Sequence, residues 1–269
     1  MYKRLSRWGP VRLLAKFRSL HAGLRALGPR RWFPYARRRI LERLHWGRSN
    51  SEFRLSAPDL QHTLVGRCST SDIDVFRHVF VQCEYACVAD LPNCNLILDC
   101  GANVGYSTCY FLSKYPSARV IAIEPDPENY SLLTRNVGPF GDRVQVLPVA
   151  LWNAAGMLVL DDEPFRDGRE WSRRVREPRA RESSGIEALD MQGLLQEVGA
   201  SRVSLLKMDI EGAERLVFDG PVSWLNFIDA IAIELHDSDC ESVFLRALRA
   251  QPFDVSRYGE LTICRRRVL

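Results

Sequence analysis

The sequence lacks a long apolar run, a paired-cysteine metal motif and a complete glycine fingerprint for dinucleotides. No uninterrupted apolar stretch approaches the roughly 18 residues that a membrane-spanning helix needs. The basic N-terminal region contains no continuous apolar segment, so we expect no cleaved secretory signal. None of the eight cysteines belongs to a C-x-x-C pair. We therefore expect buried, reduced thiols in a cytoplasmic protein, in preference to disulfides or a zinc site.

The composition predicts one soluble globular domain with an extension. The 269 residues are 46% hydrophobic and 26% charged, which is enough to build a sizeable core. The net charge of +4 is unevenly distributed, because residues 1–50 contain fourteen lysines and arginines and a single acid, Glu42. We expect a basic amphipathic helical arm over residues 1–50 and a separate, net acidic domain over residues 51–269.

Apolar residues in the arm recur at spacings of four and three, which predicts one stripe of a helix. The stripe consists of Leu13, Phe17, Leu20, Leu24 and Leu27. Gly28-Pro29 ends this helix, and a second short helix around residues 40–44 is expected after RRWFPYARRR. The arm either packs on its own domain or makes peripheral contact, through residues 10–27, with the inner face of a membrane. Nucleic acid is not expected as a partner, because no RNA-binding signature accompanies the basic residues.

Short buried strands alternate with helices in the rest of the chain. We expect strands at residues 96–100, 119–124, 143–153, 203–209, 230–236 and 261–266. We expect helices at residues 104–115, 127–137, 187–199 and 243–250, with a solvated, arginine-rich loop over residues 161–182. This alternation predicts an α/β fold with a doubly wound, mostly parallel sheet and helices on both faces. Ligands of such sheets bind beyond the carboxyl ends of the strands, so the residues that end strands are the candidates for a site.

The stretch LILDCGANVG, residues 96–105, places a tight turn directly after a buried strand. Gly101 and Gly105 permit a sharp turn and let a ligand approach the backbone, and the following helix points its N–H groups at that ligand. A dinucleotide site would have G-x-G-x-x-G, but here Asn103 replaces the middle glycine and the third is missing. Asp99 would repel a pyrophosphate and suits an ammonium or sulfonium group.

Glu124 ends the next expected strand, 23 residues after Gly101, where an acid commonly binds the hydroxyls of a ribose. An adenosine with a positively charged amino-acid tail fits both features, which indicates S-adenosylmethionine. The alternative for each feature alone is structural, since the glycines form a turn and Glu124 can cap the helix after Pro125. The predicted cofactor-binding residues are Asp99, Gly101, Ala102, Asn103, Gly105, Glu124 and Asp209.

The motifs DCGANVGYST, AIEPDPENY, VALWN, LLKMDIEGAE and AIELH, in this order, resemble the FkbM family of S-adenosylmethionine-dependent methyltransferases. The resemblance covers about residues 70–240, and its K-x-D-x-E-G-x-E block is more specific than the glycine turn. It implies the seven-stranded class I (Rossmann-like) methyltransferase sheet. It also implies O-methylation, with a hydroxyl of a sugar, glycan or natural product as the acceptor.

Five polar residues at the ends of two strands are the candidates for catalysis. Lys207, Asp209 and Glu211 are spaced by two, so in extended chain they face one side, and Glu234 and His236 have the same relation on the next strand. A sulfonium is an activated methyl donor, so the enzyme has to align an in-line displacement and remove the hydroxyl proton. His236 is the first choice for the base and Glu211 the second. Asp209 and Glu234 would orient the reactants, and Lys207 would bind an acid or the developing alkoxide.

Other interpretations of these residues remain open at this point. Asp209 and Glu211 can also cap a helix. Asp209, Glu211, Glu234 and His236 would suit Mg²⁺ or Mn²⁺, but no further ligand pattern accompanies them, so a base is expected in preference to a metal. The alternatives to a methyltransferase are an inactive methyltransferase-like scaffold whose arm recruits a partner and a dinucleotide-dependent oxidoreductase.

Overall fold

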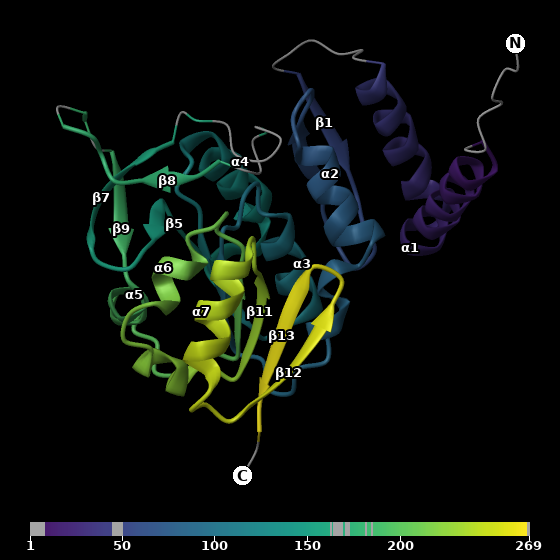
Figure 1. Ribbon diagram of the computed structural model, residues 1–269. Helices are drawn as coiled ribbons and strands as arrows, with labels where there is room; N and C mark the ends of the chain where they lie inside the picture. Colours follow the sequence, from purple (N-terminus) through teal and green to yellow (C-terminus); the bar gives the residue numbers. More distant parts are fainter. Residues whose placement is uncertain are drawn as a thin grey trace, which may run out of the picture.

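A seven-stranded, mostly parallel sheet forms the centre of the molecule (Figure 1). The structure, a computed structural model, describes residues 9–44, 51–161, 163, 169, 173–180, 182–183 and 185–267. The strand order is β12-β13-β11-β10-β3-β4-β5, with β13 antiparallel to both of its neighbours and the other pairs parallel. The strands are β3 (Leu96–Cys100), β4 (Arg119–Ile123), β5 (Val144–Leu147), β10 (Leu205–Met208), β11 (Ala230–Glu234), β12 (Phe253–Tyr258) and β13 (Leu261–Arg266).

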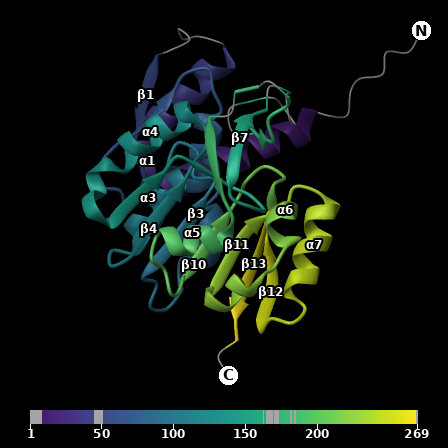
Figure 2. The same cartoon turned by 90° about the vertical axis from the view of Figure 1, so that its left-hand side faces the viewer.

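Helices cover both faces of this sheet, which confirms the expected doubly wound architecture (Figures 1 and 2). Successive residues of a buried strand alternate between two apolar cores, as Ile97 and Leu98 do in β3. The core that contains Ile97 is closed by α2 (Asp72–Phe76), α3 (Tyr106–Lys114) and α4 (Pro127–Val137). The core that contains Leu98 is closed by α5 (Met191–Glu197), α6 (Glu214–Phe218) and α7 (Ser238–Leu248).

The strand order reverses between β3 and β10, and this reversal determines where a ligand can bind. The chain runs outward from β3 through β4 to β5, and then returns to place β10 on the other side of β3. The carboxyl ends of β3 and β10 therefore diverge into different connections and leave a crevice between them. Gly101 follows β3 and Asp209 follows β10, so residues from the two halves of the chain meet there.

A second, smaller sheet lies beside β5 and differs from expectation. It consists of β6 (Val149–Leu151), β9 (Ile186–Leu189), β7 (Gly156–Leu160) and β8 (Val175–Arg176). The helix expected over residues 187–199 is wrong in its first part, because Ile186 and Ala188 alternate into a small core as strand residues do. The helix begins only at Met191. Asp190 is its N-cap, and the Asp190 side chain accepts a hydrogen bond from the N–H of Gly193. Much of the expected loop over residues 161–182 lies outside the described residues.

Other strands were not expected from the sequence. The hairpin of β1 (Glu52–Leu55) and β2 (Leu64–Arg67) pairs in antiparallel register ahead of α2. Strand β12 is the sheet edge, where only Phe253 is buried, so it has no apolar alternation to indicate it. The eight cysteines are all free and six are buried, as the sequence predicts.

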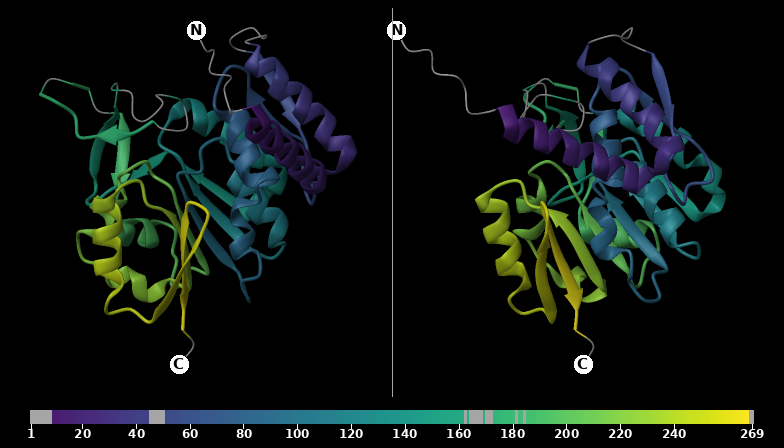
Figure 3. Two further views of the ribbon diagram at one scale, coloured as in Figure 1. Left: turned by 45° about the vertical axis from the view of Figure 1, so that its right-hand side comes forward. Right: turned by 90° about the vertical axis from the view of Figure 1, so that its right-hand side faces the viewer.

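The N-terminal arm forms α1 (Gly9–Arg43), which is broken at Gly28, where φ is 70° and ψ is 162°. The break is where the sequence predicts it, but the second segment begins with Pro29 instead of after residue 39. Proline suits the first turn of a helix, because its missing N–H has no partner to bond there. Leu27 and Tyr35 are buried in the core of the domain, so α1 packs alongside α2 (Figure 3). The side chains of the stripe residues 13–20 lie outside the described residues.

None of the helices in the described part of the chain combines the length and the apolar character that crossing a bilayer requires.

Candidate active site

The turn between β3 and α3 brings the backbone of β3 against that of β10. Gly101 has a φ of +77°, and a Cβ atom there would lie 1.8 Å from the carbonyl oxygen of Asp209. Gly105 has a φ of +86°, and a Cβ atom there would lie 2.6 Å from the side chain of Leu133 in α4. Packing within the fold therefore requires glycine at both positions, and Gly101 also lines the two pockets at this edge of the sheet. Asn103 also has a positive φ, of 50°, and its side-chain oxygen accepts the N–H of Val104.

Glu124, directly after β4, is held in a defined orientation beside this turn. Its two carboxylate oxygens accept hydrogen bonds from the N–H of Asn103 at 2.8 Å and the N–H of Asp126 at 3.0 Å. Burial raises the pKa of Glu124 to about 7, although these N–H groups favour the carboxylate. The acid is thus fixed by the turn after β3 and is 6% exposed at the wall of a pocket.

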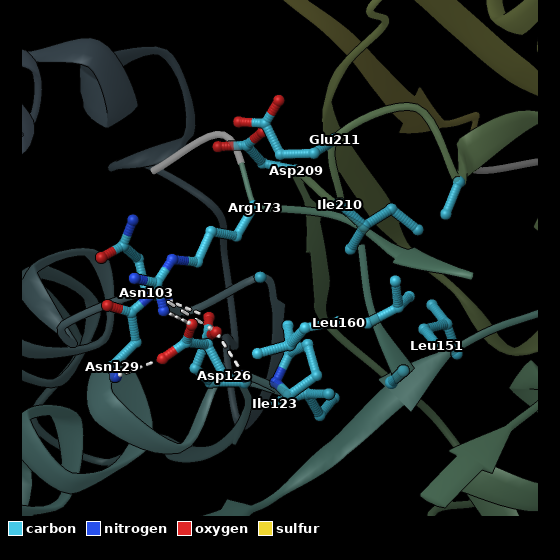
Figure 4. A pocket seen from close by; sticks show the side chains of 16 residues that line it. Asn103, Ile123, Asp126, Asn129, Leu151, Leu160, Arg173, Asp209, Ile210 and Glu211 are labelled. Atoms are coloured by element: carbon cyan, nitrogen blue, oxygen red, sulfur yellow. Dashed lines mark hydrogen bonds and ion pairs between the residues drawn. The ribbon is translucent and has the colours of Figure 1, made fainter. Parts of the chain in front are cut away.

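That pocket, called pocket A, lies beyond the ends of β4 and β6 (Figure 4). Apolar side chains of the two sheets form one side and polar ones the other. The lining includes Ile123, Glu124, Asp126, Leu151, Leu160 and Arg173. Arg173 reaches across the pocket to form an ion pair with Asp126, which also caps α4. Pocket A therefore combines an apolar wall with acids, including Glu124.

A larger cavity of about 300 Å³, called pocket B, lies between the strand ends and α2. It shares Gly101, Asn103, Asp209 and Glu211 with pocket A, so one ligand can span both. Carboxylates dominate its polar lining, which includes Glu84, Asp209, Glu211, Glu234 and Glu260. Burial raises the pKa of Glu84 to about 7, and the nearby Asp209 and Glu234 carboxylates act in the same direction. Pocket B thus favours a positively charged ligand.

His236 lies beside pocket B and is surrounded by four carboxylates. Its Nε2 atom is 3.5 Å from Asp209, 3.3 Å from Glu211 and 3.6 Å from Glu234, and its Nδ1 atom is 2.9 Å from Glu214. Burial lowers the pKa of the imidazole, but Glu211 and Glu214 more than reverse this and raise it to about 11. The ring is therefore an imidazolium at neutral pH, and carboxylates lie against both of its nitrogens.

Lys207 and Asp99 form a buried ion pair beneath this site. The Nζ atom of Lys207 lies 3.1 Å from Asp99 and donates to the carbonyl oxygen of Gly101 at 2.7 Å. Burial by itself lowers the pKa of Lys207, but the Asp99 and Asp209 carboxylates together raise it above its usual value, so the ammonium stays charged. Asp99 also accepts hydrogen bonds from the hydroxyls of Ser107 and Thr108. Its carboxylate is 0% exposed and lines neither pocket.

The structure brings most of the predicted site residues together. Asp209, Glu211, Glu234 and His236 meet at the carboxyl ends of the neighbouring strands β10 and β11. Glu211 reaches the cluster through a left-handed turn with a φ of 54°, because the chain is not extended there. Of the other predicted residues, Gly101, Ala102, Asn103, Glu124 and Lys207 line a pocket, whereas Asp99 and Gly105 do not.

Sequence reasoning missed three acids of the site. Glu214 is the last acid of the quoted K-x-D-x-E-G-x-E block, so its position was visible but its contact with His236 was not. Glu84 follows α2 in the segment VQCEY, and Glu260 lies in the turn of the β12–β13 hairpin. No local pattern marks these two acids, because only the packing of distant elements brings them to pocket B.

Two groups of described residues have the geometry to hold a divalent cation. Ligand atoms of Asp209, Glu234 and His236 lie within 4.8 Å of one another, and so do those of Glu84, Glu234 and Glu260. Carboxylate oxygens with one imidazole suit Mg²⁺ or Mn²⁺.

Proteins of known class resemble this chain over more than half of its length. A family model described as Methyltransferase FkbM domain matches residues 99–254. Methyltransferase sdnD of Sordaria araneosa is 31% identical over 176 residues, which cover 54% of this chain and 67% of the relative. The 2-O-methyltransferase NoeI of Sinorhizobium fredii is 29% identical over 159 residues, which cover 54% of this chain and 64% of the relative. Among solved structures, a SAM-dependent O-methyltransferase from Thermotoga maritima covers 85% of this chain and 82% of its own, with a TM-score of 0.42 and 12% identity.

Proposed function

We propose, because this chain belongs to the FkbM methyltransferase family, that it transfers a methyl group from S-adenosylmethionine to a hydroxyl of a sugar, glycan or natural-product acceptor. The observation that carries the proposal is the cluster of Asp209, Glu211 and Glu234 around His236, at the junction of two pockets. The cluster provides groups that bind positive charge and a group that can hold a proton at the place where donor and acceptor would meet.

The two pockets differ in the way that the two halves of S-adenosylmethionine differ. Pocket A has apolar walls at Ile123 and Leu151 for an adenine, and Glu124 at its edge for the ribose hydroxyls. Pocket B is acidic, which suits an ammonium and a sulfonium. The same carboxylates would repel the pyrophosphate of a dinucleotide, so the geometry gives no support to an oxidoreductase.

Bound S-adenosylmethionine supplies an already activated methyl group, so the protein has to align the acceptor and accept its proton. His236 is the proposed base. In the structure its pKa is about 11 because acids surround it, so the ring is protonated at neutral pH. A positively charged ligand in pocket B offsets those acids and lowers this pKa, so His236 can take a proton only when the donor is in place.

The remaining residues of the cluster have supporting roles in this proposal. Asp209 and Glu234 orient His236 and the acceptor hydroxyl, and Glu211 is the second candidate for the base, since it lies 3.3 Å from the ring. Lys207 donates to the carbonyl of Gly101 and pairs with Asp99, so these two residues position the turn. Lys207 also lines pocket B, where it can bind an acid or the developing alkoxide. For Asp99 the positioning role is proposed in place of the direct contact that the sequence suggested.

The acceptor and the location belong to the same proposal. The relative NoeI is named a 2-O-methyltransferase, which favours a hydroxyl acceptor. Eight free thiols favour a reducing compartment, and we propose the cytoplasm. Peripheral membrane contact through residues 10–27 stays a prediction, because most of those side chains lie outside the described residues.

Calorimetric titration with S-adenosylmethionine tests the proposal, with NAD as the competing ligand. Glu124→Ala removes a charged hydrogen-bond acceptor and is expected to weaken S-adenosylmethionine binding by about 1.5–3 kcal/mol. Glu187→Ala is the matched control, because Glu187 is an exposed acid of the small sheet. Turnover is then assayed by mass spectrometry of a panel of hydroxylated sugars and glycans. No binding of S-adenosylmethionine, or binding of NAD in its place, contradicts the cofactor, and binding without methyl transfer to any acceptor favours the inactive scaffold.

A further inference from the structure

The second segment of α1 carries apolar side chains on the face that points away from the domain. Phe33, Ile40 and Leu44 are 66%, 56% and 62% exposed. Leu44 follows the helix, but its N–H bonds to the carbonyl oxygen of Ile40 and continues the helical turn. At 3.6 residues per turn the three side chains and Arg37 fall within an arc of about 60°. Three large apolar side chains are thus aligned on one outward face.

Arginines flank this apolar face. Arg30, Arg37 and Arg43 are all exposed. None of the three forms an ion pair with another residue in the ranges that the structure describes. The outer face defined by Phe33, Ile40 and Leu44 and these arginines therefore combines unneutralised positive charge with exposed apolar area.

The opposite face of the same helix is anchored to the domain. Tyr35 is buried, with its ring 5.7 Å from that of Phe76 in α2. Arg39 forms an ion pair with Asp74 of α2, and Glu42 accepts a hydrogen bond from the N–H of Ser69 at 3.0 Å. Because these contacts use the inner face, the outer face is held in a fixed orientation and cannot turn inward to bury its apolar side chains.

We propose that this outer face binds an anionic membrane surface. A helix with a narrow apolar stripe between arginines suits insertion into the headgroup region, where the apolar side chains enter the acyl boundary and the arginines contact lipid phosphates. The positive charge matches a lipid surface better than the mixed polar rim of a protein interface. The site differs from the stripe over residues 13–27 that the sequence indicated, since Leu27 at the end of that stripe is buried.

The anchored arm also adjoins the proposed active site. The membrane proposal nevertheless does not depend on the proposed methyl transfer. Gly23 of α1 lies against the π-helical turn η1 (Arg77–Val81), because a Cβ atom at Gly23 would lie 3.7 Å from the side chain of Val81. His78 and Val79 of η1 line pocket B. The arm is therefore in contact with an element that forms part of the pocket wall.

Flotation of the full-length protein with lipid vesicles tests the proposal. Vesicles of phosphatidylcholine with phosphatidylglycerol are compared with vesicles of phosphatidylcholine alone, at low and high salt. Phe33→Ser with Ile40→Ser changes no charge and is expected to weaken binding to the acidic vesicles at least about tenfold. Arg30→Gln with Arg37→Gln is expected to weaken it by about fivefold for each arginine at low salt, and the difference should shrink at high salt.

Leu245→Ser with Arg249→Gln is the matched control, because Leu245 is exposed on α7 and Arg249 is exposed directly after that helix. The control should float as the unchanged protein does, and thermal unfolding verifies that every variant is folded. Unchanged flotation of the Phe33 and Ile40 variant overturns the proposal, because the lipid would then bind elsewhere, and so does the lack of flotation by the unchanged protein. Sedimentation velocity provides the remaining outcome. If this variant dissociates an oligomer and floats normally, the face is an interface between copies.

Discussion

Replacing Glu214 by glutamine should move the pH dependence of turnover, because Glu214 is the acid closest to His236. Its carboxylate is fully buried and lies 2.9 Å from Nδ1 of the ring. Glu214→Gln keeps the shape and an oxygen that can accept the N–H of Ile210, which is now bonded at 3.0 Å. It removes one negative charge, and an opposite charge at this distance is typically worth about 1–3 pKa units. The pKa of His236, about 11 in the structure, should therefore fall by that amount.

A base acts only when it has lost its proton, so turnover should rise with pH through the pKa of His236 in the complex. In Glu214→Gln this rising limb should lie about 1–3 pH units lower than in the unchanged enzyme. Part of the gain at neutral pH is offset, because a weaker base accepts a proton less readily. The assay is kcat against pH at saturating donor and acceptor. Glu241→Gln serves as the control, since Glu241 is a partly exposed acid in the first turn of α7 that pairs with Arg257, away from the acids around His236.

Glu214→Gln should also lower the stability of the folded protein at neutral pH. The folded pKa of His236 is raised above its unfolded value, so its protonation stabilises the fold fully below about pH 6.5, and this is lost as the pH rises through about 11. Glu214→Gln should lower the free energy of unfolding at pH 7 by about 1.4–4 kcal/mol, one pKa unit being about 1.36 kcal/mol. The deficit should close at alkaline pH. If stability falls as described but the rising limb of kcat does not move, His236 is a structural imidazolium and Glu211 becomes the base.

Three further predictions follow from the geometry. Gly101→Ala should prevent normal folding, because its Cβ atom would lie 1.8 Å from the carbonyl oxygen of Asp209. Gly220→Ala should fold normally, because no atom lies within 4 Å of the added Cβ atom. Soluble yield and thermal unfolding compare the two variants. Lys207→Met should lower the free energy of unfolding in guanidinium by about 3–5 kcal/mol, because it leaves the Asp99 carboxylate buried without its cation. Adding Asp99→Asn should recover part of this loss. A double variant no more stable than the single one contradicts this explanation. Chelation with EDTA should leave turnover unchanged, since the proposed base His236 accepts the hydroxyl proton without a metal ion. Activity lost on chelation and restored by Mg²⁺ would establish metal catalysis instead.

The sequence alone determined two features of this protein, the architecture of the sheet and the meeting of polar strand-end residues at one of its edges. Apolar strands between amphipathic helices predict a parallel sheet, because strands buried on both faces read as continuous apolar runs. The positions of Asp209, Glu234 and His236 at strand ends predict that they meet, because the carboxyl ends of parallel strands share one edge. Both inferences use local pattern and a topological rule, and the structure confirms both.

Only the tertiary structure decided which groups these residues face. Asp99 and Lys207 each lie one residue before the end of a strand and are 108 residues apart. The sequence indicates contact with a ligand for both, but the β3–β10 register pairs Lys207 with Asp99. Their roles, like the protonation of His236, depend on distances across the fold and on the loss of solvent there, which strengthens interactions between charges. The arm shows the same limit, because Tyr35 and Phe33 are neighbours in a helix, yet one is buried against α2 and the other exposed. A pattern along the chain records which side chains are apolar, whereas the direction of each surface is set by the elements that pack against it.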